Sequence, residues 1–477
     1  MDPLISFEHL AAGLAEDHEV VIEHSGRCVT RKGLDAEASL LANKIAALGL
    51  PSTQRIGVLL PNSADSVASV MAVARSGHCC LPLSPGLTPD ELSETVERCA
   101  VGAILCRAEK ASDLPAGMAV IRVDEVPLRS PETVKTVGQK LDARRAFVCL
   151  STSGSTGRPK LAERSARAVL ANARRVATAL GVTSADRFVA VVPFWHANGF
   201  SNCLLMPLLA GASIVTMDRF LPRPFLDALV EHRVTVVIGS PFIYRSLLRV
   251  LDVGYDLSRV RAWISSGALL PAELDAELRE RGIRVRQLYG SSETGTLCIS
   301  GEQQKPPGTV GAPLPGVGIR LLQPDGSRCA EGEEGEVRVR SDAMFSAYVG
   351  STDAVFAEDG SYKMNDRAVF EKGELRLLGR SDAMINVAGV KVDPEEVRAV
   401  IEKMAGVRRA LVSGVENAAG GETVKARVVA DTELSAGDLL AHCRQQLAEY
   451  KLPRIIEFSD HIPEDLMGKS ARRLLGD

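Results

Sequence analysis

The sequence predicts an α/β protein, with a large N-terminal region of two doubly wound α/β subdomains plus a small antiparallel sheet, followed by a small α+β C-terminal domain. Three observations support this prediction. The chain has 477 residues, which is too long for one hydrophobic core. Short apolar runs alternate with amphipathic helical stretches over the first two thirds of the chain. After about residue 300 the pattern changes to hairpin signals rich in glycine and proline.

The first strand–helix series predicts a mainly parallel sheet with helices on both faces. Gly77 ends the first helix of this series. Thr88 is a good N-cap for the second helix, and Pro89 suits its first helical position. The alternating strands and helices are expected at residues 55–61, 63–77, 78–85, 88–100 and 103–106.

A second series of the same kind extends from 145 to 290 and predicts the second subdomain. Its helices are expected around residues 201–209, 223–232, 241–251 and 271–281. The alternation in 335–341 then indicates a small antiparallel sheet. The last segment has its own strand–helix pattern, including a helix near 435–449. We therefore divide the chain into an N-terminal domain (1–379) and a C-terminal domain (383–477), with the boundary between them at residues 380–382.

Composition excludes several classes of protein. A formal net charge of −4 and a pI near 6.1 argue against nucleic acid as the partner. No apolar run is long enough to span a membrane, and the acidic N-terminus lacks the features of a signal peptide. The 10 cysteines show no metal-ligand spacing, and we interpret them as reduced structural thiols. The sequence therefore predicts a soluble cytoplasmic protein.

A loop rich in small hydroxyl residues is the sharpest local feature. STSGSTGRPK (151–160) directly follows the strand Phe147–Leu150, and its backbone N–H groups could curl around phosphate oxygens. Pro159 before Lys160 excludes a Walker A loop, which continues straight into a helix. A flexible Ser/Gly turn is the alternative interpretation. The candidate phosphate-binding residues are Thr152, Ser153, Gly154, Ser155, Thr156, Gly157 and Lys160.

This loop resembles the [ST]SG[ST]TGxPK motif of the ANL superfamily of adenylating enzymes, which comprises acyl- and aryl-CoA synthetases, peptide-synthetase adenylation domains and luciferases. Further motifs follow in the family order and spacing and cover nearly the entire chain. YGSSETG (289–295) looks like the YGxTE segment, and SGALLP (266–271) is similar to the adenine-binding segment. GRSDAMINVAG (379–389) matches GRxDDxIxxxG, and PEDLMGKSAR (463–472) resembles PxTxxGKxxR.

The resemblance assigns expected roles to single residues. Glu293 would hold Mg²⁺ together with Thr156, and Thr294 would contact the α-phosphate. Asp366 would bind the ribose hydroxyls, although Met364-Asn365 replaces the usual Thr-Gly, and Arg380 would contact the ribose or phosphate. Asp382 falls at the hinge of a mobile C-terminal domain, where an N-cap is the alternative, and Lys469 is the expected catalytic lysine rather than a solvated surface charge. The remaining nucleotide-binding candidates are Gly267, Ala268, Tyr289, Gly290 and Ser291.

PFWHANG (193–199) resembles the PxFHxxG segment of acyl-CoA and aryl-acid ligases. His196 would line the acyl pocket, unless it is an ordinary core histidine. Amino-acid adenylation domains usually place an aspartate here, and 195–201 contains none, which disfavours an α-amino acid. The pocket candidates are Trp195, His196, Phe242, Gly267 and Gly290. They suggest an aryl or a short-to-medium acyl acid.

The resemblance predicts a ligase that uses ATP and Mg²⁺ to activate a small carboxylic acid and transfers the acyl group to coenzyme A. Loading of a carrier-protein phosphopantetheine is the close alternative, because no basic cluster for the CoA 3′-phosphate stands out. A non-catalytic nucleotide-binding module is the alternative from another class, favoured by the departures near Asn365 and at 346–348. Arg164, Arg167, Arg174 and Arg175 lie on a predicted helix and are interpreted as solvated. Whether the protein forms a homodimer is left open by the sequence.

Overall fold

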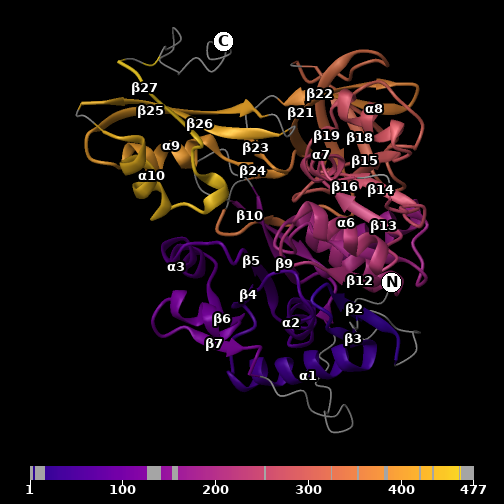
Figure 1. Cartoon of the computed structure of the whole chain (residues 1–477), viewed down its shortest axis with the longest axis vertical. Coiled ribbons are helices and arrows are strands. Elements are labelled where there is room, and N and C mark those ends of the chain that lie inside the picture. The colour runs from indigo at the N-terminus through magenta and orange to yellow at the C-terminus, as the bar shows by residue number, and fades with distance from the viewer. Residues whose placement is uncertain are drawn as a thin grey trace.

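Two large, mainly parallel sheets form the frame of the N-terminal region, as the strand–helix alternation predicts (Figure 1). The computed structural model describes residues 4–5, 17–125, 141–152, 160–251, 254–323, 325–351, 354–380, 385–417, 421–431, 434–460 and 462. The predicted α/β class, with a smaller α+β domain at the C-terminal end, is confirmed.

The first sheet has seven strands in the order β20-β10-β9-β5-β4-β6-β7. Their bounds are β4 Arg55–Leu59, β5 Cys79–Leu83, β6 Val101–Cys106, β7 Ala119–Arg122, β9 Ala146–Thr152, β10 Lys160–Ser165 and β20 Ala347–Tyr348. The helices α2 (Ala64–Arg75) and α3 (Pro89–Arg98) connect its central strands, and the short 3₁₀ helix η2 spans Ala108–Asp113. Thr88 caps α3 as predicted, because its hydroxyl accepts from the backbone N–H of Glu91. A separate pair, β1 (Leu4–Ile5) and β8 (Leu141–Asp142), is antiparallel.

The second sheet has eight strands in the order β16-β15-β14-β13-β11-β12-β2-β3. Their bounds are β2 Glu19–Glu23, β3 Cys28–Thr30, β11 Arg187–Ala190, β12 Ser213–Thr216, β13 Val236–Gly239, β14 Ala262–Ser265, β15 Val285–Ser291 and β16 Gly295–Ile299. The helices are α1 Arg31–Ala47, α4 Ala166–Leu180, α5 Met206–Ala210, α6 Pro222–Glu231, α7 Pro241–Leu248 and α8 Ala272–Glu280. The helix expected around 201–209 is a π-helix, η4 (Gly199–Leu205), continued by α5.

The two sheets share their main hydrophobic core. Buried side chains of α1, α2 and α4 fill the layer between them and pack against residues from both sheets. The outer face of the second sheet is covered by α6, α7 and α8, and that of the first sheet by α3. The fold is therefore layered, with helices inside and outside. The ten cysteines are free thiols, of which eight are buried.

A smaller sheet of five strands and a separate C-terminal unit complete the chain. The five strands follow the order β17-β22-β21-β19-β18, with bounds β17 Thr309–Gly311, β18 Gly318–Leu322, β19 Glu334–Arg340, β21 Tyr362–Glu371 and β22 Glu374–Arg380. The C-terminal elements are β23 Ile385–Val387, β24 Val390–Val392, α9 Pro394–Glu402, β25 Val407–Glu416, β26 Glu422–Ala430, α10 Ala436–Arg444, η5 Glu449–Lys451 and β27 Ile455–Phe458. They enclose a core of their own. Among the described residues, no helix is long and apolar enough to cross a membrane.

Candidate functional site

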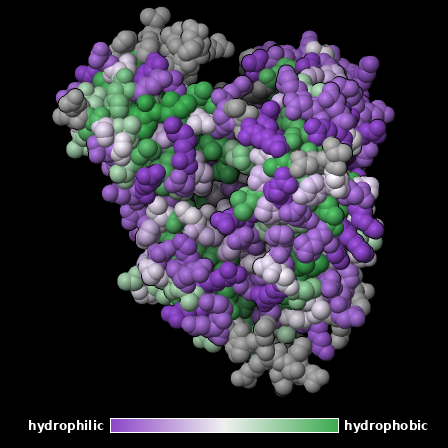
Figure 2. Space-filling view, in the orientation of Figure 1, coloured by the Kyte–Doolittle hydropathy of each residue, from purple (hydrophilic) through white to green (hydrophobic). Residues whose placement is uncertain are grey.

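A cavity of about 1380 Å³ lies where the two large sheets, the five-stranded sheet and the C-terminal unit meet. The surface is visibly hollowed between the C-terminal unit and the rest of the molecule (Figure 2). Residues at or just beyond the carboxyl ends of parallel strands line it, namely Ser84, Val191, Ser240, Ser266 and Gly290. Ligands of open α/β sheets bind at this edge. The cavity is therefore the candidate site.

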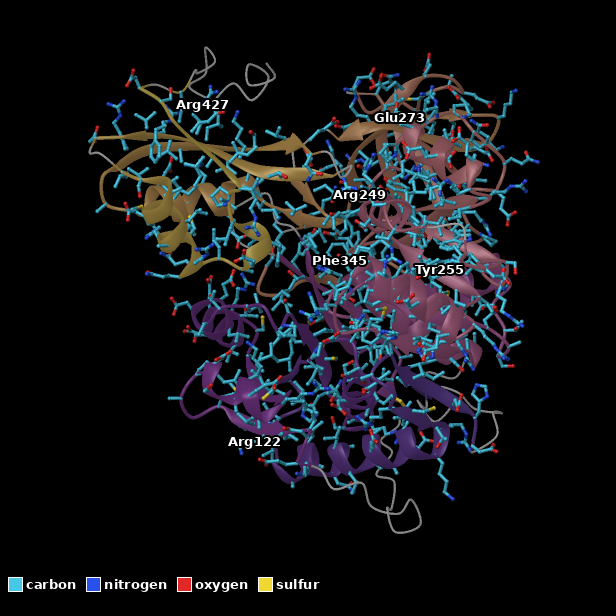
Figure 3. The ribbon with its side chains drawn as sticks, viewed as in Figure 1. Arg122, Arg249, Tyr255, Glu273, Phe345 and Arg427 are labelled. Carbon is cyan, nitrogen blue, oxygen red and sulfur yellow. The ribbon has the colours of Figure 1, made fainter. Side chains whose placement is uncertain are left out.

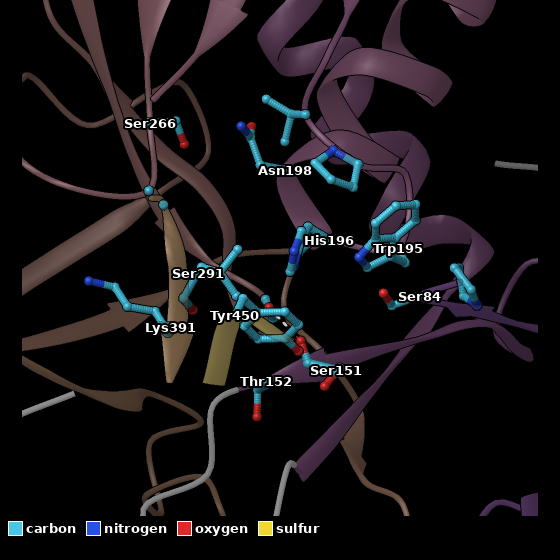
Figure 4. Close-up of a pocket in the computed structure, with 18 of the residues that line it drawn as sticks. Ser84, Ser151, Thr152, Trp195, His196, Asn198, Ser266, Ser291, Lys391 and Tyr450 are labelled. Carbon is cyan, nitrogen blue, oxygen red and sulfur yellow. Dashed lines mark hydrogen bonds between the residues drawn. The ribbon is translucent and has the colours of Figure 1, made fainter. Parts of the chain in front are cut away.

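The cavity brings together most of the residues singled out from the sequence. Twelve of them line it: Thr152, Lys160, Trp195, His196, Phe242, Gly267, Ala268, Tyr289, Gly290, Ser291, Glu293 and Asp366. Figure 4 shows Trp195, His196 and Asn198 along one wall, with Ser266 and Lys391 on the opposite side. The predicted residues Ser153, Gly154, Ser155, Thr156, Gly157, Asp382 and Lys469 lie outside the described part of the chain.

Two residues predicted to bind the nucleoside contact each other. The Tyr289 hydroxyl donates to Oδ2 of Asp366 over 2.8 Å, so β15 and β21 are joined at the cavity. Arg380 lies directly opposite Asp366 in the β21–β22 pair. The aromatic ring and the carboxylate are thus fixed side by side, an arrangement suited to a nucleoside base and its ribose hydroxyls.

Glu293 is held by a tyrosine that the sequence analysis treated only as a departure from the family pattern. Oε1 of Glu293 accepts from the Tyr348 hydroxyl over 2.9 Å, and the Lys160 ammonium lies 5.0 Å from the centre of the Tyr348 ring. Burial raises the pKa of Tyr348, and the charge of Glu293 raises it further, so this hydroxyl stays a donor. Phe345, labelled near the centre of Figure 3, packs on Tyr348 with ring centres 4.8 Å apart.

Thr294 does not line the cavity, in contrast to its neighbour Glu293. Its side chain is fully buried, and its hydroxyl donates to the carbonyl oxygen of Gly295 and accepts from the backbone N–H of Ser291. Thr294 therefore closes the turn between β15 and β16 on the side away from the cavity.

At two glycines of the predicted motifs, the neighbouring backbone leaves no room for a side chain. A Cβ atom on Gly290 would lie 2.0 Å from the carbonyl oxygen of Gly295, and one on Gly199 would lie 2.0 Å from that of Pro193. Contacts this short cannot be relieved by a side-chain movement, because both neighbours are backbone. Gly199 lets the chain enter η4 directly after His196, and Gly290 lets β15 turn into β16 beside Glu293.

His196 lines the cavity wall and is partly buried, and its backbone N–H donates to the carbonyl oxygen of Pro193 over 3.0 Å. Desolvation lowers its pKa to about 4. The imidazole is therefore neutral at pH 7 and offers a hydrogen bond but no charge to a bound carboxylate. A positive charge for the reacting group has to come from another residue.

This pKa predicts an acid-sensitive contribution to folding. The unfolded chain takes up a proton on His196 as the pH falls through 6.5, whereas the folded chain does not until about pH 4. Stability is thus complete above pH 6.5 and declines below it, by about 2 kcal/mol between pH 7 and pH 5 from this residue. Urea unfolding of the wild type and His196→Asn at both pH values measures it. The wild type should lose about 2 kcal/mol more than the variant, and equal losses would contradict the assignment.

The C-terminal unit forms one wall of the cavity through the turn of the β23–β24 hairpin. A Cβ atom on Gly267 would lie 3.3 Å from the carbonyl oxygen of Gly389, and one on Gly389 would lie 3.0 Å from the Cβ of Ser240. Both glycines also have positive φ values, +88° and +91°. Lys391 and Tyr450 line the same wall. Sequence reasoning identified neither as a cavity residue.

A buried charge cluster fastens the C-terminal unit to α3. The Lys451 ammonium lies 2.7 Å from Oε1 of Glu396 and 3.3 Å from Oε1 of Glu91, which also accepts from the backbone N–H of Ala448 over 3.0 Å. The other oxygen of Glu91 accepts from the backbone N–H of Thr88. Burial alone would lower the pKa of Lys451, but Tyr450 and the two carboxylates raise it above its ordinary value. We call Glu91, Glu396 and Lys451 the interdomain cluster.

Comparison with known families and relatives gives a consistent result. The AMP-binding enzyme family matches residues 7–349, and the AMP-binding enzyme C-terminal domain matches 396–469. The chain is 30% identical to feruloyl-CoA synthase of an Amycolatopsis species, over 95% of this chain and 94% of that protein. It is 28% identical to naringenin synthase of Pestalotiopsis fici over 94% of this chain, which spans only 18% of that much longer protein.

Solved structures share the whole fold, and they differ in how well they superpose. A double mutant of o-succinylbenzoate CoA synthetase (MenE) from Bacillus subtilis, bound with its product analogue OSB-NCoA, has a TM-score of 0.89 at 26% identity and covers 98% of both chains. ATP-bound MatB from Rhodopseudomonas palustris has a TM-score of 0.72 at 27% identity and covers 98% of this chain and 97% of that chain. Nearly equal identity with unequal superposition indicates a different arrangement of similar parts.

Proposed function

The chain belongs to the family of AMP-binding enzymes, and from this membership we propose that it is an acid:thiol ligase. It activates a small aryl or short-to-medium acyl carboxylic acid with ATP as the acyl-adenylate and transfers the acyl group to coenzyme A. The observation that carries this proposal is a single cavity in which the nucleotide-binding candidates, His196 and the C-terminal wall face one another. Named relatives of the chain are acyl-CoA ligases and synthetases.

In the proposed site the adenine stacks near Tyr289 between the 266–268 and 289–291 segments, and Asp366 with Arg380 takes the ribose. The phosphates lie against Thr152, Lys160 and the loop that joins them. Carboxylate and hydroxyl oxygens suit Mg²⁺, and Glu293 already presents a carboxylate whose second oxygen is not used by Tyr348. Mg²⁺ would be held by Glu293 and Thr156 and would supply positive charge beside the phosphates.

In the first step an oxygen of the substrate carboxylate attacks the α-phosphorus of ATP, and pyrophosphate leaves. Two anions meet, so the barrier is largely electrostatic and is lowered by fixed positive charge. His196 is neutral and cannot supply that charge. We therefore assign it to Lys469, with Lys160 on the opposite side of the phosphates.

In the second step a thiolate attacks the acyl carbon of the mixed anhydride, and AMP leaves. The arrangement described above fits this step, because the β23–β24 hairpin stands at the cavity. It also superposes better on the enzyme bound with a CoA-type product analogue than on the ATP-bound relative. We propose that the C-terminal domain turns about the 380–382 hinge between the two steps.

Pyrophosphate exchange with a panel of carboxylic acids tests the ligase assignment. We expect acid-dependent incorporation of labelled pyrophosphate into ATP, and thioester formation when CoA is added. A holo-carrier protein in place of CoA measures the alternative acceptor. If no aryl, aliphatic or hydroxy acid supports exchange although ATP binds, the non-catalytic module is the correct interpretation and the ligase proposal fails.

A further inference from the structure

The lining of the candidate cavity includes buried polar side chains, although an acyl or aryl body calls for apolar contacts. Four of them come from β10, α4 and η4 and are almost completely buried, with exposed fractions of 0 to 3%. We call this set the polar wall, and it consists of Arg164, Asn172, Ser201 and Asn202. Trp195 and Phe242 line other parts of the same cavity and suit a flat apolar body.

The sequence analysis placed Arg164 on a solvated helix, which is wrong. Arg164 lies on β10, opposite Val148 of β9, and its side chain is fully buried. Strand geometry turns alternate residues to opposite faces, so Arg164 points into the protein although its sequence neighbours are polar. The helix expected to carry it begins two residues later, at Ala166.

Each member of the polar wall has a buried polar atom with no hydrogen-bond partner in the described part of the chain. These atoms are Nε of Arg164, Nδ2 of Asn172, Oγ of Ser201 and Oδ1 of Asn202. An unmade hydrogen bond of this kind costs about 1–3 kcal/mol, so four in one wall are unusual for a region with only a structural role.

Other hydrogen bonds fix the orientation of the wall. Nη2 of Arg164 donates to the carbonyl oxygen of Ala343 over 2.6 Å, and Oδ1 of Asn172 accepts from the backbone N–H of Thr296 over 2.7 Å. Nδ2 of Asn202 donates to Oδ1 of Asn198 over 2.8 Å. The unused atoms of Arg164, Asn172 and Asn202 are therefore held in place before a ligand arrives, as a selective pocket requires.

The wall also carries a charge. Burial lowers the pKa of Arg164 to about 10, which leaves the guanidinium protonated at pH 7. The charge of Glu293 opposes this lowering of the Arg164 pKa, but the Glu293 carboxylate already accepts a hydrogen bond from Tyr348. Among the unused atoms, those of Arg164 and Asn172 are donors and the Ser201 hydroxyl can donate. This combination selects an oxygen acceptor, with an anionic oxygen favoured.

We propose that the acid activated by this enzyme carries a second oxygen group, remote from the reacting carboxyl, that binds to the polar wall. The group is a phenolic hydroxyl, a keto oxygen or a second carboxylate, and an acid with an all-carbon end is a poor substrate. This inference rests on the proposed ligase function and narrows its substrate class.

Matched acids of equal length test the inference on the wild-type enzyme. Cinnamate, 4-hydroxycinnamate and 4-carboxycinnamate form one series, and hexanoate and adipate form another. In at least one series, kcat/KM for pyrophosphate release should be about 100-fold higher for an oxygen-ended acid than for its all-carbon partner, since a site with unpaired polar groups rejects a ligand that cannot pair them. Comparison of the hydroxyl-bearing with the carboxylate-bearing acids identifies which oxygen group the enzyme prefers. All-carbon acids that equal or exceed their partners in both series would overturn the inference while leaving the ligase function intact.

Two variants connect this preference to the wall. Ser201→Ala and Asn202→Leu should each lower the preference for the oxygen-ended acid about 10-fold. Ser69→Ala is the matched control, because Ser69 is a fully buried serine of α2 whose hydroxyl likewise has no partner among the described residues and lies outside the cavity. An unchanged preference in both wall variants would also overturn the inference.

A binding measurement tests the preference for oxygen-ended acids independently of catalytic turnover. The rise in melting temperature with AMP plus each acid reports which acid end the cavity accepts, even if no pyrophosphate is released. Absence of release with all acids would refute the ligase function. A larger shift with the oxygen-ended acids would support the polar wall in either case, and equal shifts would count against it.

Discussion

Lys469→Ala should reduce acid-dependent ATP–pyrophosphate exchange by about 10³-fold while the enzyme still forms thioester from supplied acyl-AMP and CoA. The reason is charge. The first step brings a carboxylate against a triphosphate, and the neutral His196 cannot supply positive charge beside them. The second step starts from the adenylate and no longer needs that cation. Exchange assays and thioester formation from chemically prepared acyl-AMP measure the two steps separately.

The control for this prediction is Lys425→Ala, which removes a positive charge from the same domain. Lys425 pairs with Glu457 over 2.7 Å and does not line the cavity. Its loss should change pyrophosphate exchange by less than about threefold. Near-normal exchange by Lys469→Ala would refute the role of this lysine. Parallel loss of both steps would indicate a folding defect, which circular dichroism and the melting temperature would reveal.

Lys451→Met should impair the second step rather than the first: we expect thioester formation to slow by ~10–100-fold, with little change in pyrophosphate exchange. The interdomain cluster joins α3 to the C-terminal unit in the arrangement described here, so the proposed rotation of the C-terminal domain would break it. Without the ammonium, Glu91 and Glu396 face each other across that junction as buried, uncompensated carboxylates. Burial already raises the pKa of Glu396, so this carboxyl can take up a proton when the lysine is removed. Protonation reduces the repulsion between the two carboxylates, and the slowing of thioester formation stays smaller than a fully charged pair would cause.

The matched variant for this second experiment is Lys425→Met. It removes the ion pair with Glu457 inside the C-terminal unit without touching the junction. Glu91→Gln keeps an oxygen for the cap of α3 and should give an intermediate effect on thioester formation. If Lys451→Met slows exchange as much as thioester formation, the cluster does not act on one arrangement selectively.

Sequence periodicity was sufficient to predict the parallel sheets, whereas Tyr289, Asp366, His196 and Glu293 were singled out by their resemblance to family motifs, and all four line one cavity. His196 and Glu293 follow strands of the second large sheet, whose carboxyl ends converge by geometry. Tyr289 lies within β15 and Asp366 lies within the antiparallel strand β21, so strand ends do not account for their positions. The roles assigned to 153–157, Asp382 and Lys469 stay predictions, because these residues lie outside the described structure.

What the sequence did not reveal depends on contacts between distant segments. Tyr348 reaches Glu293 only because β20 pairs with β10, and Glu91 meets Lys451 across 360 positions. The polar wall arises where the irregular π-helix turns Ser201 and Asn202 inward beside a buried strand arginine. No periodic pattern encodes such a meeting, since the residues are set by packing rather than by local propensity.

The position of β2 has a consequence for how the chain is made. This early strand pairs in parallel with β12, with Val21 opposite Ile214. During synthesis, the first segment therefore waits for roughly 190 further residues before its neighbour emerges from the ribosome. Truncated chains that end before β12 would leave the second edge of this apolar strand unpaired, with only β3 on its other side, and an open strand edge is a template for aggregation. A nascent chain of this enzyme should thus bind ribosome-associated chaperones until Thr216, the last residue of β12, has left the exit tunnel.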